Sequence, residues 1–177
     1  MAIRGDGSLW AWGANSSGQL GDGSPRRNED GSALLRLEPV KIMDGVARVS
    51  AGSTRTMAVT DDGGLYSWGL HLVGVIAPNV YIPDNNIPVR ILGLDDVIDV
   101  SVDTSEAVAI RSDGSLWARV WEDEAQLVEN VLAISVGGFR FDGHVLAVTD
   151  DGNLWTWGGR WNEGSELEMI MSNILMP

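Results

Sequence analysis

The 177-residue chain is 44% hydrophobic and 21% charged, which is the balance of an ordinary globular domain with a buried core. Its formal net charge of −13 repels phosphate backbones and its twelve basic residues are scattered, so direct nucleic-acid binding is not expected. The sequence contains no cysteine, which excludes disulfides, thiolate zinc sites and cysteine nucleophiles, and no apolar run of about 18 residues for membrane insertion.

A short motif recurs four times along the chain. Each copy reads Asp-Gly, a small or polar residue, leucine and an aromatic residue, and the glycines stand at positions 7, 63, 114 and 152. The spacings are therefore 56, 51 and 38 residues, so the third unit is short. Periods of this size are typical of repeat architectures. We predict a single domain over 1–177, with units at approximately 6–61, 62–112 and 113–150 and a partial unit at 151–177.

Short runs rich in β-branched and aromatic residues, bounded by Gly, Asp and Ser, predict strands throughout. In chain order they cover 9–13, 39–42, 46–52, 56–60, 65–69, 88–92, 97–102, 107–110, 116–119, 132–138, 145–149 and 154–158. None is long enough to predict a helix. Asp62-Gly63 supplies the positive φ angle of a tight hairpin turn, so 59–60 should pair with 65–66.

Both faces of these strands are apolar. Leu9 and Ala11 point to one face, and Trp10 and Trp12 point to the other. Both faces must therefore be covered, as they are when sheets stack. With 39–42 and 88–92 as outer strands, each repeat holds about four strands. The predicted fold is all-β, a β-propeller of four-stranded antiparallel blades.

The segment 12–23, Trp-Gly-Ala-Asn-Ser-Ser-Gly-Gln-Leu-Gly-Asp-Gly, lies in the first unit and begins at the end of its Asp-Gly strand. Together with the Asp-Gly strands, it resembles the repeat of the regulator of chromosome condensation family. The resemblance implies a propeller, typically of seven blades, that serves as an interaction platform. Later units depart from it, because an apolar insertion follows Gly69 and only Asn162 and Gly164 remain of the turn after Gly158. The near absence of lysine favours a bacterial-type member or a fragment of one.

The number of repeats corresponds to about three and a half blades, fewer than the four that close a propeller. Two alternatives follow. The chain is part of a longer protein, or it is half of a dimeric ring in which two copies meet through exposed edge strands. An uncovered edge strand favours pairing with another chain, so a homodimer is one expectation.

Four residues are candidates for protein binding. Six tryptophans recur at repeat positions and are interpreted as packing between blades; they are Trp10, Trp12, Trp68, Trp117, Trp155 and Trp157. Trp121 and Trp161 lie outside the repeated strand, and Arg160 stands beside the second. Exposed tryptophan with arginine is typical of binding hot spots. Tyr81 lies in the apolar insertion 70–88, and for all these loops packing onto their own blade is an open alternative.

The sequence offers no candidate catalytic residues, metal site or cofactor site. His71 and His144 fit no nucleophile or metal-ligand pattern. The acidic pairs 61–62, 95–96 and 150–151 lack the alternate spacing of a calcium loop and are interpreted as turn residues.

The sequence therefore favours a non-catalytic protein–protein interaction scaffold that binds through its blade-connecting loops, with no enzyme activity. The resemblance keeps two narrower alternatives open. One is guanine-nucleotide exchange on a small GTPase, and the other is inhibition of a secreted enzyme such as a β-lactamase. The identity of the protein partner and the cellular compartment are not determined by the sequence.

Overall fold

The computed structural model describes residues 1–70, 85–103, 107–120, 123–137, 144–158 and 168–171. These residues form fifteen strands in four antiparallel sheets. Sheet 1 contains β1 (Ala2–Ile3), β2 (Leu9–Ala14) and β3 (Leu35–Met43). Sheet 2 contains β4 (Val46–Ala51), β5 (Arg55–Thr60), β6 (Leu65–Gly69) and β7 (Asn85–Arg90).

The two remaining sheets repeat this pattern. Sheet 3 contains β8 (Val97–Val102), β9 (Ala107–Arg111), β10 (Leu116–Val120) and β11 (Asp123–Val128). Sheet 4 contains β12 (Val131–Gly137), β13 (His144–Thr149), β14 (Leu154–Gly158) and β15 (Glu168–Met171). In every sheet, strands that follow one another in the chain are neighbours. The prediction of an all-β fold built from antiparallel blades is confirmed; three of the four sheets have the predicted four strands, and sheet 1 has three in the described residues.

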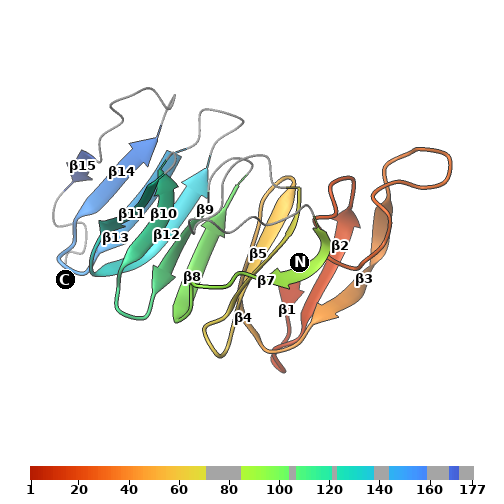
Figure 1. Ribbon diagram of the computed structural model, residues 1–177, viewed down its shortest axis with the longest axis horizontal. Coiled ribbons are helices and arrows are strands. Elements are labelled where there is room, and N and C mark those ends of the chain that lie inside the picture. Colours follow the sequence, from red (N-terminus) through yellow and green to blue (C-terminus); the bar gives the residue numbers. More distant parts are fainter. Residues whose placement is uncertain (71–84, 104–106, 121–122, 138–143, 159–167, 172–177) are drawn as a thin grey trace.

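The four sheets follow one another along the longest axis of the molecule, from sheet 1 to sheet 4 (Figure 1). The predicted hairpin is present, because Val59 pairs with Leu65 and Ala58 with Tyr66 across the Asp-Gly turn. The residue limits of the four repeat units and the single-domain organisation remain predictions. Among the described residues, no helix is long and apolar enough to cross a membrane.

The core is divided into three clusters, one at each junction between neighbouring sheets. Leu9 of sheet 1 packs with Trp68 of sheet 2. Leu65 of sheet 2 lies in the cluster against which Trp117 of sheet 3 packs. Leu116 of sheet 3 lies in the cluster against which Trp155 of sheet 4 packs. Each junction thus joins the leucine side of one sheet to the aromatic side of the next.

Trp68, Trp117 and Trp155 follow this rule, whereas Trp10 and Trp12 do not. Trp68 is fully buried, and Trp10, Trp117 and Trp155 are partly buried. The Trp12 side chain is 42% exposed, so its predicted packing between blades is wrong in this chain. Trp10 and Trp12 alternate with Leu9 and Ala11, so both lie on the side of sheet 1 that faces away from sheet 2, and neither packs between two described sheets of this chain. The side chain of Trp157 lies outside the described residues.

Candidate functional site

The protein-binding candidates from the sequence fall outside the described residues. Trp121, Trp161, Arg160 and Tyr81 all lie in segments that the structure does not describe. Their role in binding therefore remains a prediction. The described part of the chain offers a different surface, formed at one end of the sheets.

Chain reversal places the Asp-Gly turns and the linkers between sheets at the same end. In sheet 2, β5 runs into the Asp-Gly turn, β6 runs away from it, and β7 returns to the same end. The linker 91–96 then leads to sheet 3 from that end. Because every sheet repeats this order, four turns and three linkers line up along the array. We call this end the turn rim.

Backbone hydrogen bonds connect each junction to two turns, that of the preceding sheet and that of the following sheet. The amide of Val97 donates to the Gly63 carbonyl at 3.0 Å, and the amide of Ser112 donates to the Asp96 carbonyl at 2.8 Å. The same pair of bonds recurs at the other two junctions, at 2.9 Å each, around Gly45 and Asn130. Gly45, Asp96 and Asn130 all have positive φ, between 59° and 67°. Gly, Asp and Asn tolerate this region best.

The turn glycine is required for this contact. A Cβ on Gly63, whose φ is +77°, would lie 3.0 Å from the Cα of Asp96. The turn therefore approaches the next linker more closely than a residue with a side chain permits.

The turn aspartates organise the turns themselves. The Asp113 carboxylate accepts from the Ser115 amide at 2.9 Å and from the Ser115 hydroxyl at 2.5 Å. Equivalent bonds reach Asp6, Asp62 and Asp151. Hydrogen bonds from the neighbouring Ser or Thr hydroxyl, and then from backbone amides, hold the pKa of each of these four carboxyl groups below its usual range. The interpretation of the acidic pairs at 61–62 and 150–151 as turn residues is confirmed.

The turn rim is strongly acidic. Its exposed carboxylates are Asp6, Asp44, Asp61, Asp62, Asp95, Asp96, Asp113, Glu129, Asp150 and Asp151. The rim also holds basic side chains that neutralise part of this charge. Arg90 lies 3.2 Å from Asp95, Arg111 lies 3.7 Å from Asp96, and Lys41 lies 2.7 Å from Asp44.

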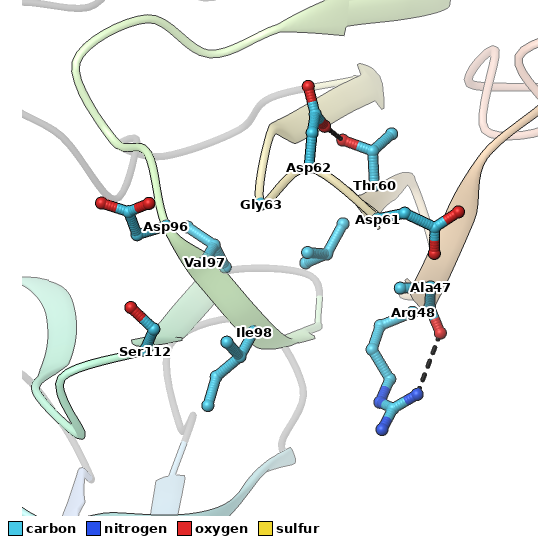
Figure 2. Close-up of a pocket in the computed structure, with 11 residues that line it drawn as sticks. Ala47, Arg48, Thr60, Asp61, Asp62, Gly63, Asp96, Val97, Ile98 and Ser112 are labelled. Carbon is cyan, nitrogen blue, oxygen red and sulfur yellow. Dashed lines mark hydrogen bonds between the residues drawn. The ribbon is translucent and has the colours of Figure 1, made fainter.

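A groove of about 420 Å³ opens on the rim between sheets 2 and 3. Asp61 and Asp62 lie on one side, and Asp96 lies on the other (Figure 2). Val59, Val97 and Ile98 supply apolar lining, and Ile98 is 49% exposed. Arg48 also lines the groove, but its guanidinium donates to the Ala47 carbonyl at 3.0 Å. The arrangement presents carboxylates beside an apolar surface, which suits a long basic side chain with an aliphatic stem.

The opposite end carries the family motif, and there its role is structural. The Trp68 indole and the Thr56 hydroxyl both donate to the Gln19 carbonyl, at 2.9 and 2.8 Å. Asn15 is fully buried, and its amide group donates to Ser24 at 3.0 Å and to Asp22 at 3.2 Å. The loop after β2 therefore holds sheet 1 against sheet 2 through these hydrogen bonds.

The turn rim was missed by reasoning from the sequence. The acidic turns were recognised one by one, but their alignment depends on the linkers lying at the same end. A signal was available in the linkers, which also carry acidic residues at positions 44, 95–96 and 129. Within the part of the chain that the structure describes, no group of three or more His, Asp or Glu residues is placed to hold a metal ion.

Two family models for the regulator of chromosome condensation (RCC1) repeat match the chain, at residues 6–59 and 46–74. The chain is 29% identical to the ultraviolet-B receptor UVR8 of Arabidopsis thaliana, over 92% of this chain and 39% of that protein. It is 27% identical to Protein RCC1 of Candida albicans, over 100% of this chain and 33% of that protein. It is 26% identical to the human E3 ubiquitin-protein ligase HERC2, over 89% of this chain and 4% of that protein.

Solved structures show the same fold. Human WBSCR16 superposes with a TM-score of 0.73 at 17% identity, over 96% of this chain and 50% of that one. Yeast RCC1 (Prp20), solved with Kap60 bound, superposes with a TM-score of 0.66 at 19% identity, over 89% of this chain and 40% of that one. The chain thus spans half or less of the length of these proteins. The two family models show that residues 6–74 contain RCC1 repeats, and the solved structures show that the chain shares the fold of RCC1.

Proposed function

We propose that this chain is a non-catalytic protein-binding module whose turn rim engages a basic surface of a partner protein. The observation that carries the proposal is the row of exposed carboxylates that the repeated turns and linkers place at one end of all four sheets. Backbone hydrogen bonds fix the turns and linkers that carry these side chains, so less of the backbone has to be ordered on binding and the cost in conformational entropy is smaller.

Charge supports a basic protein partner. A surface of one sign attracts a complementary surface and speeds its association. The lowered pKa of the turn aspartates keeps them ionised well below neutral pH. The groove beside Asp61 and Asp96 adds an apolar lining that discriminates an extended arginine or lysine side chain from a small cation.

Binding of a fluorescent peptide that alternates arginine and alanine tests the proposal. The variant Asp61→Asn/Asp96→Asn removes two charges from the groove, and asparagine at 96 tolerates the positive φ, as Asn130 does. The matched control Glu29→Gln/Glu38→Gln removes two exposed charges away from the rim. We expect the rim variant to weaken binding by about tenfold, while the control stays within about twofold of wild type.

Equal losses in both variants would show attraction by net charge alone, and the turn rim would not be the site. The salt dependence gives a second readout. The difference between the variants should shrink as the salt concentration rises, because exposed charges are screened beyond the Debye length.

The two narrower roles, nucleotide exchange on a small GTPase and inhibition of a β-lactamase, can each be assayed directly. Acceleration of nucleotide release from a small GTPase, or inhibition of a β-lactamase, would replace the general scaffold proposal with that specific role. HERC2 is named as a ubiquitin ligase, but this chain covers only 4% of it. Ligase activity is therefore not part of the proposal.

A further inference from the structure

The strands that begin sheets 2, 3 and 4 share a β-bulge at their second residue. In β8, Val97 pairs with Arg111 and Asp99 pairs with Ile110, so the ladder skips Ile98. The ladder skips Ala47 in β4 and Leu132 in β12 in the same way. An extra residue of this kind bends the strand and redirects its side chain. The chain therefore repeats one bulged position three times, at 47, 98 and 132.

The two large bulged side chains are accessible to solvent. Ile98 is 49% exposed and Leu132 is 59% exposed. The residues directly before them, Val97 and Val131, are 1% and 4% exposed and belong to core clusters. Sheet 3 packs against sheet 2 on one side and sheet 4 on the other, yet Ile98 stays exposed. Its exposure is therefore a property of the bulged position and does not depend on a missing neighbour.

Hydrogen bonds between sheets hold β4, β8 and β12 side by side. The amide of Val102 in β8 donates to the Ser50 hydroxyl of β4 at 3.0 Å. The amide of Val136 in β12 donates to the Ser101 hydroxyl of β8, also at 3.0 Å. Ser50 and Ser101 each lie three residues after the bulge of their strand, so both junctions have the same offset. The bulged positions 47, 98 and 132 thus follow one another along the array, and we call them the bulge row.

An acidic linker residue lies three positions before each member of the bulge row. These residues are Asp44, Asp95 and Glu129, and Asp96 is nearer still to Ile98 in the chain. Three residues span at most about 10 Å even when the chain is fully extended. A carboxylate and a bulged side chain are therefore close enough to contact neighbouring residues of one partner segment.

The groove between sheets 2 and 3 combines the two features. Asp61 and Asp96 line it together with Ala47 and Ile98 (Figure 2). The bulged residue on the side of sheet 2 is alanine, whose small side chain fills little of the space beside Ile98. Covering an exposed aliphatic side chain is favourable, and exposed apolar surface often marks a binding site. The groove accordingly offers an apolar contact directly beside its carboxylates.

We propose that the basic partner segment carries large aliphatic residues next to its basic ones, and that these aliphatic side chains pack on Ile98 and Leu132. The inference rests on the proposed function, because it concerns the same rim and the same partner. Basic side chains meet the carboxylates of the turns and linkers, and aliphatic side chains meet the bulge row. A purely basic segment would leave Ile98 and Leu132 in water. The bulge row therefore selects a segment that is both basic and aliphatic.

Two fluorescent peptides of equal length and charge test the inference, one alternating arginine with alanine and the other arginine with leucine. Wild type should bind the leucine peptide about tenfold more tightly than the alanine peptide. Ile98→Ala/Leu132→Ala should reduce this ratio to about twofold or less and leave the affinity for the alanine peptide unchanged. Each single variant should remove about half of the gain in binding free energy. Alanine suits the bulge, because Ala47 occupies the equivalent position. The control Leu92→Ala shortens a 71% exposed leucine outside the bulge row and should keep the full preference for leucine.

The outcomes separate this inference from the proposed function. Equal affinity of wild type for the two peptides, with both still weakened by Asp61→Asn/Asp96→Asn, would overturn the inference and leave the proposed function in place. A preference for leucine that survives in Ile98→Ala/Leu132→Ala would also overturn it, because the aliphatic contact would then lie elsewhere. If wild type binds neither peptide, the proposed function and the inference fail together.

Discussion

Asn153→Ser should stabilise the protein, because it would give a buried indole the hydrogen-bond partner that two other repeats provide. In the first repeat the Trp10 indole donates to the Ser8 hydroxyl at 2.9 Å. In the third, the Trp117 indole donates to the Ser115 hydroxyl at 2.8 Å. In the fourth, asparagine replaces this serine, and the buried Nε1 of Trp155 has no hydrogen-bond partner among the described residues.

The expected change in the free energy of unfolding follows from the hydrogen bonds that the substitution gains and loses. An unpaired buried N–H group costs about 1 to 3 kcal/mol. The substitution removes the bond from the Asn153 amide group to Asp151, at 2.7 Å, but this bond is exposed and contributes little. The net gain should be about 1 kcal/mol, which corresponds to a rise in Tm of about 2 to 4 °C for a domain of this size.

Urea denaturation followed by tryptophan fluorescence measures the effect, with Ser115→Ala as the reciprocal variant. Ser115→Ala should lower the free energy of unfolding by about 1 to 2 kcal/mol, because it removes the partner of Trp117. The reasoning is refuted if Ser115→Ala destabilises as expected while Asn153→Ser has no effect or destabilises. The indole of Trp155 would then gain nothing from the serine.

Two further predictions concern the loop after β2 and the Asp-Gly turns. Gly21→Ala should lower the free energy of unfolding by about 2 kcal/mol or more, since its Cβ would lie 2.6 Å from the Trp68 indole nitrogen and its φ is +81°. Urea denaturation would measure it, and Gly5→Ala, where a Cβ meets no atom within 4 Å, is the control. Stability should also fall in acid, because four turn aspartates have a lowered pKa in the folded protein: Asp6, Asp62, Asp113 and Asp151. Their contribution is complete above their unfolded pKa of about 3.9 and is lost as the pH falls through the folded pKa. Denaturation at pH 7 and pH 3 checks this, and Asp113→Asn should reduce the difference.

The hairpins were predictable from the sequence because their determinants are local. Asp62-Gly63 sets the turn, and alternating apolar residues set the strands on either side. The position of Trp12 was not predictable in the same way. It occupies the same repeat position as Trp68, three residues after the strand leucine and directly before a glycine, yet one is 42% exposed and the other is fully buried. The difference depends on whether another sheet lies against that face, which is a property of the assembled array.

The turn rim was unpredictable for a related reason. Asp61 and Asp96 are 35 positions apart in the chain and belong to different repeats. They line one groove because the linker of sheet 3 bonds to the turn of sheet 2. Local turn chemistry explains each residue separately, but only the junction between sheets brings them together.

The three linkers also show that the backbone conformation of the turn rim does not depend on a charged side chain. Gly45, Asp96 and Asn130 occupy the same left-handed position and accept the same hydrogen bond through the carbonyl group. One has no side chain, one is charged and one is neutral. The fold therefore requires the backbone conformation at this position and not the carboxylate. Asp96→Asn should accordingly leave the free energy of unfolding within about 0.5 kcal/mol of wild type, whereas Asp96→Val should lower it by about 1 to 2 kcal/mol. If Asp96→Asn proved as damaging as Asp96→Val, the carboxylate would be structural, and a loss of peptide binding in the rim variant could not be assigned to recognition.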